Sequence, residues 1–320
     1  MAITGYRNKF ITGEVGDTGM SQADPMHGMR MMNSNGTFNV ENIGTPGTLI
    51  TDLYLDLVRM KWWQFILLLA AFIVGVNLFF TAIYLVAGIQ FITGLPGGTF
   101  IADFLKAYLF SLQSFTTSGF GLVSTNSGVT FIGTFEAVCG LLIFALATGL
   151  IFGRFSRPSA RIVHSENAVI APYKNGKALM FRICNGRKKY MIANLEWFVM
   201  VAFNQQMGNR VVRRFHDLKL EVSKGLFFPL SWTIVHPIDE ESPLFNLTEQ
   251  DYTDGFLEVM AIVNGFDETF HQNVHTKFGY LHDEIIWGAK FILNFEAMPT
   301  GKMRHYVNKV GNIEKVVLPD

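Results

Sequence analysis

The chain has 320 residues, of which 49% are hydrophobic and 16% charged, and its 26 basic and 26 acidic side chains leave no net formal charge. This balance excludes a disordered acidic or basic chain, and it provides no general basic face for nucleic acid. Two cysteines are too few for a disulfide framework. The charge is unevenly spread, because residues 62–153 carry only Asp103, Lys106 and Glu136. One part of the chain therefore suits lipid and the remainder suits water.

The N-terminal part predicts a flexible cytoplasmic tail followed by a short helix on the membrane surface. Residues 1–50 are rich in Gly, Met, Asn and Thr, and they lack the run of roughly 7–15 apolar residues that a secretory signal needs. Within residues 51–60, Leu53, Leu57 and Met60 share one side of a helix, and the charged residues lie elsewhere. This pattern is typical of an interfacial helix.

Two apolar segments are long enough to cross a bilayer. Residues 62–89 contain no charged side chain, and residues 131–153 contain only Glu136, which we expect to be satisfied inside the protein. Basic residues gather at one end of each span: Arg59 and Lys61 before the first, and Arg154, Arg157 and Arg161 after the second. By the positive-inside rule, residues 61–158 form a two-span domain of the plasma membrane (the inner membrane of a Gram-negative cell) with both termini cytoplasmic.

The stretch between the spans is too apolar for a simple external loop and too short for a third span. Residues 101–115 predict a helix that leads into a Gly-containing strand at residues 117–121. Irregular backbone at membrane depth is tolerated only where protein or water surrounds it, so we expect a re-entrant helix with a return strand. The apolar face of this helix is expected to contain Phe104, Leu105, Tyr108, Leu109 and Leu112.

After the second span the pattern changes to short strands separated by turns. Asn175-Gly176 between two apolar runs is a strong β-hairpin signal. With few helical patterns between them, residues 159–320 are predicted to form a cytoplasmic β sandwich. The expected strands are residues 168–172, 177–185, 197–203, 226–235, 256–263 and 285–293.

The segment Thr117-Ser118-Gly119-Phe120-Gly121 is the candidate site for ion chemistry. A cation stripped of its water needs oxygen ligands, and backbone carbonyls can point the same way when neighbouring residues adopt dihedrals of both signs, which glycine allows. Repeated by several subunits around an axis, these carbonyls form stacked rings, with the Thr117 hydroxyl as the innermost ligand. The alternative is a polar turn without function. The place of the segment, after a re-entrant helix and between two spans, favours an ion filter.

These features resemble the inward-rectifier potassium channel family, most nearly its prokaryotic (KirBac) branch, over about residues 47–300. The family filter has the form Thr-Val/Ile-Gly-Tyr/Phe-Gly, which Thr117, Gly119, Phe120 and Gly121 match. Further matching motifs follow in the family's order: GLIFGRFSRP at 149–158, HDL at 216–218, HPIDEESPLF at 236–245, Glu258, and EIIWG at 284–288. The resemblance implies a homotetrameric potassium channel with a slide helix and an immunoglobulin-like cytoplasmic domain, and without a cofactor.

Two departures from the family pattern concern the filter. Ser118 stands where the family has Val or Ile, and its hydroxyl loosens the packing behind the filter, which weakens the expectation that sodium is rejected. Gln113 and Val123 stand where eukaryotic relatives pair a glutamate with an arginine. Because both charges are absent together, neither is left buried and unpaired.

The second span is expected to line the pore. Phe144, Thr148 and Phe152 recur every four residues and so lie near one face of a helix, which the resemblance assigns to the ion path. The resemblance makes Phe152 the hydrophobic gate at the bundle crossing. It places Phe144 where strongly rectifying relatives have an acid that holds polyamines, so we expect weak rectification. Gly149 is either a hinge or a close helix contact.

The basic residues beside the spans are candidate lipid ligands. Arg59, Lys61, Arg154, Arg157 and Arg161 would each gain about 1 kcal/mol beside anionic headgroups. The alternative is that they set topology alone. Because Ser159 and Ala160 replace lysines of animal relatives, general anionic-lipid sensitivity is expected rather than a complete phosphoinositide site.

Neither metal binding nor catalysis is predicted for the cytoplasmic domain. Glu268, His271, His275 and His282 are interpreted as surface residues, because strand and loop patterns do not bring them together. The sequence has no phosphate-binding glycine loop, nucleophile elbow or zinc framework. The rival to a channel is a two-span receptor or scaffold whose sandwich binds a cytoplasmic partner and whose filter-like segment does not conduct.

Overall fold

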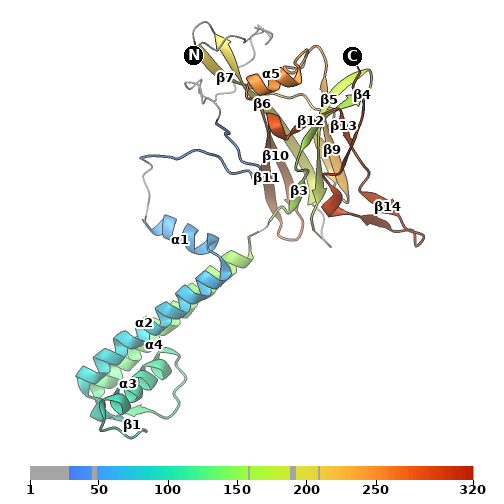
Figure 1. Cartoon of the computed structure of the whole chain (residues 1–320). Helices are drawn as coiled ribbons and strands as arrows, with labels where there is room; N and C mark the ends of the chain where they lie inside the picture. The colour runs from blue at the N-terminus through green and yellow to red at the C-terminus, as the bar shows by residue number, and fades with distance from the viewer. Residues whose placement is uncertain (1–28, 45–48, 158, 188–191, 208–209, 320) are drawn as a thin grey trace. The chain divides into compact units, whose positions relative to one another are not determined.

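The computed structural model describes residues 29–44, 49–157, 159–187, 192–207 and 210–319. The chain divides into a helical unit, Gly44–Arg157, and a β unit composed of Met1–Ile43 and Pro158–Asp320. Figure 1 traces the ribbon of each unit. The second boundary falls beside residue 158, where the sequence predicts the end of the membrane domain.

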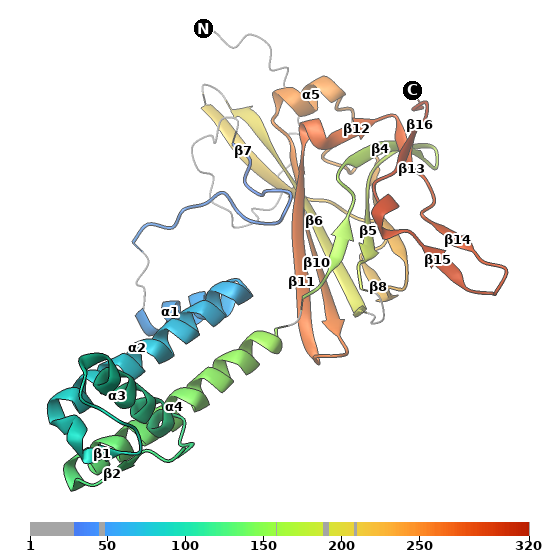
Figure 2. The ribbon, with the colours of Figure 1, turned by 60° about the horizontal axis from the view of Figure 1, so that its bottom comes forward.

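The helical unit consists of two long helices with a shorter helix between them in the sequence. Its elements are α1 Leu49–Arg59, α2 Trp62–Gly88, η1 Ile89–Phe91, β1 Ile92–Thr93, α3 Phe100–Phe115, β2 Val123–Ser124 and α4 Ser127–Phe155. Helix α2 with η1, and helix α4, are long and apolar enough to cross a membrane. Figures 1 and 2 show α2 and α4 side by side, with α3 against both at the end that carries β1.

A side-chain cap fixes the residue at which helix α4 begins. Asn126 Oδ1 accepts hydrogen bonds from the backbone N–H groups of Gly128 (2.8 Å) and Val129 (3.3 Å), so α4 begins at Ser127. The sequence prediction of a start at residue 131 is therefore four residues late, because it followed apolar character and not the cap.

The apolar face of helix α3 is not the face that is buried within the chain. Phe104 and Leu105, which lie on the apolar face, are 37% and 52% exposed. The buried positions are Lys106, Ala107, Phe110, Ser111, Gln113 and Phe115. Polar groups on α2 and α4 require polar partners, and this requirement turns the smaller and more polar side of α3 inward. The larger apolar side is left for lipid or for another subunit.

The β unit is built around two five-stranded sheets, which confirms the predicted sandwich. One sheet has the order β11-β10-β6-β7 with β8 paired to β6, and the other has the order β12-β4-β5-β3 with β9 paired to β5. A shared core lies between them, with Trp197, Phe181 and Phe278 among its largest buried side chains. The strands are β3 Ile162–His164, β4 Ala168–Tyr173, β5 Gly176–Asn185, β6 Ile192–Met207, β7 Arg210–Asp217, β8 Lys224–Phe227, β9 Ser231–Ile238, β10 Glu258–Asp267, β11 Gln272–Leu281 and β12 Ile285–Trp287.

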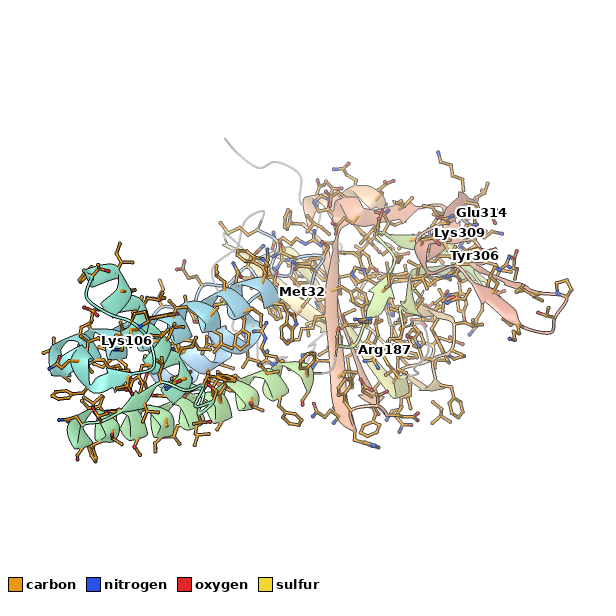
Figure 3. All side chains as sticks on the ribbon, turned by 90° about the horizontal axis from the view of Figure 1, so that it is seen from below. Met32, Lys106, Arg187, Tyr306, Lys309 and Glu314 are labelled. Atoms are coloured by element: carbon orange, nitrogen blue, oxygen red, sulfur yellow. The ribbon has the colours of Figure 1, made fainter. Side chains whose placement is uncertain are left out.

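Smaller elements complete the β unit. Strand β13 pairs with β16, and β14 pairs with β15. Near the end of the chain the Lys309 ammonium lies 4.4 Å from the centre of the Tyr306 ring (Figure 3). The bounds are α5 Glu249–Asp254, η2 His282–Glu284, β13 Ala289–Phe291, β14 Phe295–Ala297, β15 Met303–His305, η3 Val307–Lys309 and β16 Ile313–Lys315.

Two of the predicted strands are interrupted. The segment 226–235 crosses from one sheet to the other, because β8 pairs with β6 and β9 pairs with β5, with Pro229 between them. The segment 285–293 breaks at Gly288, whose φ of +64° belongs to the left-handed region. Apolar character alone did not reveal either change of direction.

Residues 29–39 pack against the strands of the β unit and are not a flexible tail. The guanidinium of Arg30 donates to both carboxylate oxygens of Glu284 at 2.8 Å. The N–H of Met32 donates to Glu258 at 2.7 Å, and the Met32 side chain (Figure 3) is buried. The tail prediction is therefore wrong for this segment, whereas the first 28 residues lie outside the described part of the chain.

Candidate ion-conduction site

The φ angle alternates in sign along residues 117–121. Thr117, Gly119 and Gly121 have φ values of +54°, +63° and +83°, and Ser118 and Phe120 do not have positive φ. An alternation of this kind directs successive carbonyl groups to one side of the strand. A Cβ added at Gly119 or Gly121 would meet no atom of the chain within 4 Å, so the sign of φ, and not crowding, is what favours glycine there.

The C-terminus of α3 holds the start of this strand. The N–H of Thr117 donates to the Ser114 carbonyl and the N–H of Ser118 donates to the Gln113 carbonyl, both at 3.0 Å. The Thr117 hydroxyl donates its hydrogen to the Thr116 carbonyl at 2.7 Å, which leaves its oxygen lone pairs for a cation. The filter-like strand is thus a direct continuation of the re-entrant helix.

The hydroxyl of Ser118 is paired within the chain. Its Oγ lies 2.9 Å from Thr116 Oγ1, which in turn donates to the Leu112 carbonyl at 2.7 Å. Position 118 therefore has no aliphatic side chain, and the hydroxyl groups of Ser118 and Thr116 are in contact instead. A polar pair in this position is consistent with looser apolar packing behind the strand.

Gln113 attaches the chain beyond the filter to the pore helix. Its Nε2 donates to the Leu122 carbonyl, and its Oε1 accepts from the Leu122 N–H at 3.4 Å. A neutral amide therefore binds both backbone groups of one residue. From the sequence it was clear that Gln113 and Val123 cannot form a charged pair. That Gln113 instead binds Leu122 through its amide was not predicted.

The predicted pore-facing residues of α4 are exposed in the isolated chain. Phe144 and Phe152 are 42% and 71% exposed, and the Thr148 hydroxyl donates to the Phe144 carbonyl at 2.8 Å. The Phe144 ring lies 5.5 Å from that of Phe115 at the end of α3. No atom of the chain lies within 4 Å of a Cβ added at Gly149, so the chain itself makes no close helix contact there.

Of the basic residues expected to bind lipid, Arg154 is directed into the protein. Its guanidinium donates to the carbonyls of Leu57 and Met60 at the end of α1, and it lies 4.7 Å and 4.5 Å from the ring centres of Trp62 and Phe65. A cation at the C-terminal end of a helix is stabilised by the unpaired carbonyls there. Arg59, Lys61, Arg157 and Arg161 are exposed.

Replacing Arg154 is expected to separate α1 from the end of α4. Arg154→Ala removes hydrogen bonds from a charged group, each contributing about 1.5–3 kcal/mol, together with the contacts to two aromatic rings. We expect a thermal unfolding midpoint in detergent that is lower by several degrees. Arg157→Ala, the matched control at an exposed arginine, should leave the midpoint nearly unchanged. Equal effects of the two substitutions would show that Arg154 contributes only charge.

The cytoplasmic histidines fall into two groups. Burial lowers the pKa of His164, His216 and His236, so these side chains are neutral at pH 7. The structure places Glu268 and His271 in the turn between β10 and β11, His275 on β11, and His282 after it. In the described residues they form no group that could hold a metal ion.

The φ angles of residues 117–121 alternate in sign, and this strand lies between two helices long enough to span a membrane. The arrangement indicates a pore-forming membrane protein. Models of two family domains match the chain. The inward rectifier potassium channel transmembrane domain matches residues 32–158, and the inward rectifier potassium channel C-terminal domain matches residues 162–320. The chain therefore belongs to the inward rectifier potassium channel family, and it is a potassium channel and not an enzyme.

Individual relatives agree with this assignment. The chain is 35% identical over 280 residues to the inward rectifier potassium channel Kirbac3.1 of Paramagnetospirillum magnetotacticum, covering 87% of this chain and 93% of that protein. It is 29% identical to the ATP-sensitive inward rectifier potassium channel 12 of Gallus gallus, covering 82% of this chain and 66% of the relative. It is 24% identical to the inward rectifier potassium channel irk-1 of Caenorhabditis elegans, covering 82% and 52%.

One solved structure has a weaker likeness. The sporulation control protein Spo0M of Bacillus subtilis matches with a TM-score of 0.22 and 7% sequence identity, covering 41% of this chain and 50% of that one. A likeness of this size says nothing about function.

Proposed function

We propose that four copies of this chain surround one axis and conduct potassium ions through residues 117–121. The observation that carries the proposal is the alternating hand of Thr117, Ser118, Gly119, Phe120 and Gly121. One strand can cover only one side of a dehydrated ion, and Phe120 is 85% exposed in the isolated chain. Symmetric copies would complete the rings of carbonyl oxygens and cover the exposed surface.

The proposed ligands are the backbone carbonyls of residues 117–120 together with the Thr117 hydroxyl. Potassium is the permeant species, and the sites require no cofactor. Selectivity depends on the number and field strength of the oxygen ligands and on how firmly they are held. The hydroxyl pair of Thr116 and Ser118 supports a preference for potassium that is weaker than an aliphatic residue at position 118 would give.

The proposed gate is a ring of Phe152 side chains at the cytoplasmic end of α4. Four apolar rings can close a narrow path by excluding water. Gly149, one turn earlier, would supply the hinge, since a Cβ added there would meet no other helix of the described residues within 4 Å. Arg154 joins the next turn to α1, so a movement of that surface helix would reach the gate directly.

Anionic lipid is the proposed regulator of that movement, at the cytoplasmic face of the plasma membrane where both chain ends would lie. Arg59, Lys61, Arg157 and Arg161 are the exposed cations that would meet the headgroups. Arg154 has a different role in this proposal, because both of its terminal guanidinium nitrogens donate to backbone carbonyls of α1 and the residue that follows it.

Flux into liposomes tests the channel. The purified full-length protein, reconstituted with anionic lipid, should take up rubidium as a potassium substitute, and external barium should block the uptake. The absence of uptake under all lipid compositions would favour the rival function, a membrane receptor or scaffold. Analytical ultracentrifugation in detergent tests the tetramer, and a monomer would contradict it.

Phe144→Asp is expected to strengthen block by internal polyamines at least about tenfold, because four carboxylates around one axis would attract a polycation. The current–voltage relation with internal spermine measures this effect. Phe144→Asn is the control, because asparagine has nearly the shape of aspartate without its charge. This variant should remain weakly rectifying. An unchanged relation in the Asp variant would remove Phe144 from the pore lining.

A further inference from the structure

A chain of polar side chains lies inside the helical unit and joins its three longest helices. Glu136 of α4 is fully buried. The Tyr84 hydroxyl of α2 donates to Glu136 Oε2 at 2.6 Å, and the Ser111 hydroxyl of α3 lies 2.5 Å from Glu136 Oε1. The Ser111 hydroxyl also lies 3.1 Å from both the side-chain oxygen and the backbone carbonyl oxygen of Asn77 on α2, whose amide donates to the Ile73 carbonyl at 2.8 Å.

The hydrogens in this chain can be counted. The Ser111 hydroxyl has one hydrogen but lies within bonding distance of both Glu136 and Asn77. If Glu136 is protonated, its O–H group donates a hydrogen bond to the Ser111 oxygen. The Ser111 hydroxyl can then donate its own hydrogen to Asn77, and each donor has an acceptor. An ionised Glu136 would leave a buried charge that makes no ion pair within the described residues, and it would leave the Asn77 oxygen without this donor.

The same helices meet again one turn further on. Ser111 and Phe115 are four residues apart on α3, and Glu136 and Gly140 are four residues apart on α4. A Cβ at Gly140 would lie 2.1 Å from the Phe115 carbonyl oxygen, so the two backbones are in close contact. Thr117, the first residue of the filter, follows two residues after Phe115. The position of α3 along α4 therefore sets the position of the filter.

We propose that Glu136, as a neutral acid, is a positioning residue for the filter. Its side chain links Ser111 of the pore helix to the inner helix and to Tyr84 of the outer helix. The link fixes the pore helix against sliding along α4, and it thereby keeps the carbonyl rings at the spacing that favours potassium. This role rests on the proposed conduction path through residues 117–121.

Three variants test the link in liposomes containing the full-length channel. Glu136→Gln keeps a neutral group that accepts from Tyr84 and donates to Ser111, so its sodium-to-potassium permeability ratio should stay within about twofold of the parent ratio. Ser111→Ala and Glu136→Ala break the link and should raise the ratio roughly tenfold, the effect expected from one lost buried hydrogen bond. Infrared spectroscopy of the parent should show the C=O band of a buried carboxylic acid, and this band should be missing in Glu136→Gln.

Each outcome separates the link from conduction itself. Intact Ser111→Ala tetramers with the parent permeability ratio would overturn the positioning role, and this variant carries the test if Glu136→Ala does not assemble. A Glu136→Gln variant that behaves like Ser111→Ala, together with no carboxylic-acid band in the parent, would overturn the neutral form. A parent protein without any flux would refute the proposed function, and the infrared band would still decide the state of Glu136.

Discussion

Gly119→Ala is expected to abolish potassium flux. Gly119 has a φ of +63°, in the left-handed region that costs an L-residue with a side chain roughly 1–2 kcal/mol. In a tetramer the cost recurs in every copy, and the strand would relax by rotating the peptide group whose carbonyl binds the ion. We expect rubidium uptake to fall at least about a hundredfold, to the level of empty liposomes.

The control for this prediction is Gly75→Ala. Gly75 lies within α2, has no positive φ, and a Cβ added there meets no atom of the chain within 4 Å. This change should preserve flux, since alanine is a better helix former than glycine. If Gly119→Ala conducted as well as Gly75→Ala, the carbonyl geometry of the strand would not be the basis of conduction.

Gly140→Ala is expected to disrupt the packing of α3 on α4. The added methyl group would lie 2.1 Å from the Phe115 carbonyl oxygen and 3.0 Å from its carbon, and a backbone cannot move aside as a flexible side chain can. Overpacking a tight contact costs about 1–3 kcal/mol, and this cost also recurs in each copy. We expect most of the protein to lose the proposed tetrameric form in detergent and the remainder to unfold at a clearly lower temperature.

Gly149→Ala provides the comparison within the same helix. Among the described residues, a Cβ at Gly149 meets no other part of the chain within 4 Å, so the fold of each copy should be retained, and we expect assembly and thermal stability to be retained with it. Size-exclusion chromatography and a thermal unfolding curve measure both properties. Similar losses in the two variants would mean that helix bending, and not contact with Phe115, is what glycine provides in α4.

Features encoded by a continuous stretch of sequence could be predicted well. The apolar run of α2 is long enough to span a bilayer without reference to any other segment. The hairpin of β4 and β5 was predicted from Asn175-Gly176, although its two-residue loop is Lys174-Asn175 and Gly176 already pairs with Tyr173. The positive φ values of Gly119 and Gly121 could be predicted in the same way, because glycine reports locally on the sign of φ, whereas the positive φ of Thr117 has no such local signal.

Features that depend on distant partners could not be predicted. Arg154 has the same charge and sequence setting as Arg157, but only Arg154 reaches the carbonyls at the end of α1. On the buried face of α3, Ser111 makes its contact with Glu136, a residue of another helix. Apolar periodicity identified an apolar face of α3 but could not tell whether that face is buried, because an exposed apolar surface in a membrane protein carries the same pattern as a core.

The docking of residues 29–39 on the β unit has a consequence for how the chain is connected. The buried carboxylate of Glu258 binds Met32 and is neutralised by Arg213 at 2.6 Å, so this attachment lies within the protein interior. The segment that precedes α1 and the strand that follows α4 are consequently anchored in the same body. Both connections of the helical unit to the rest of the described chain therefore run to one folded body and not to two.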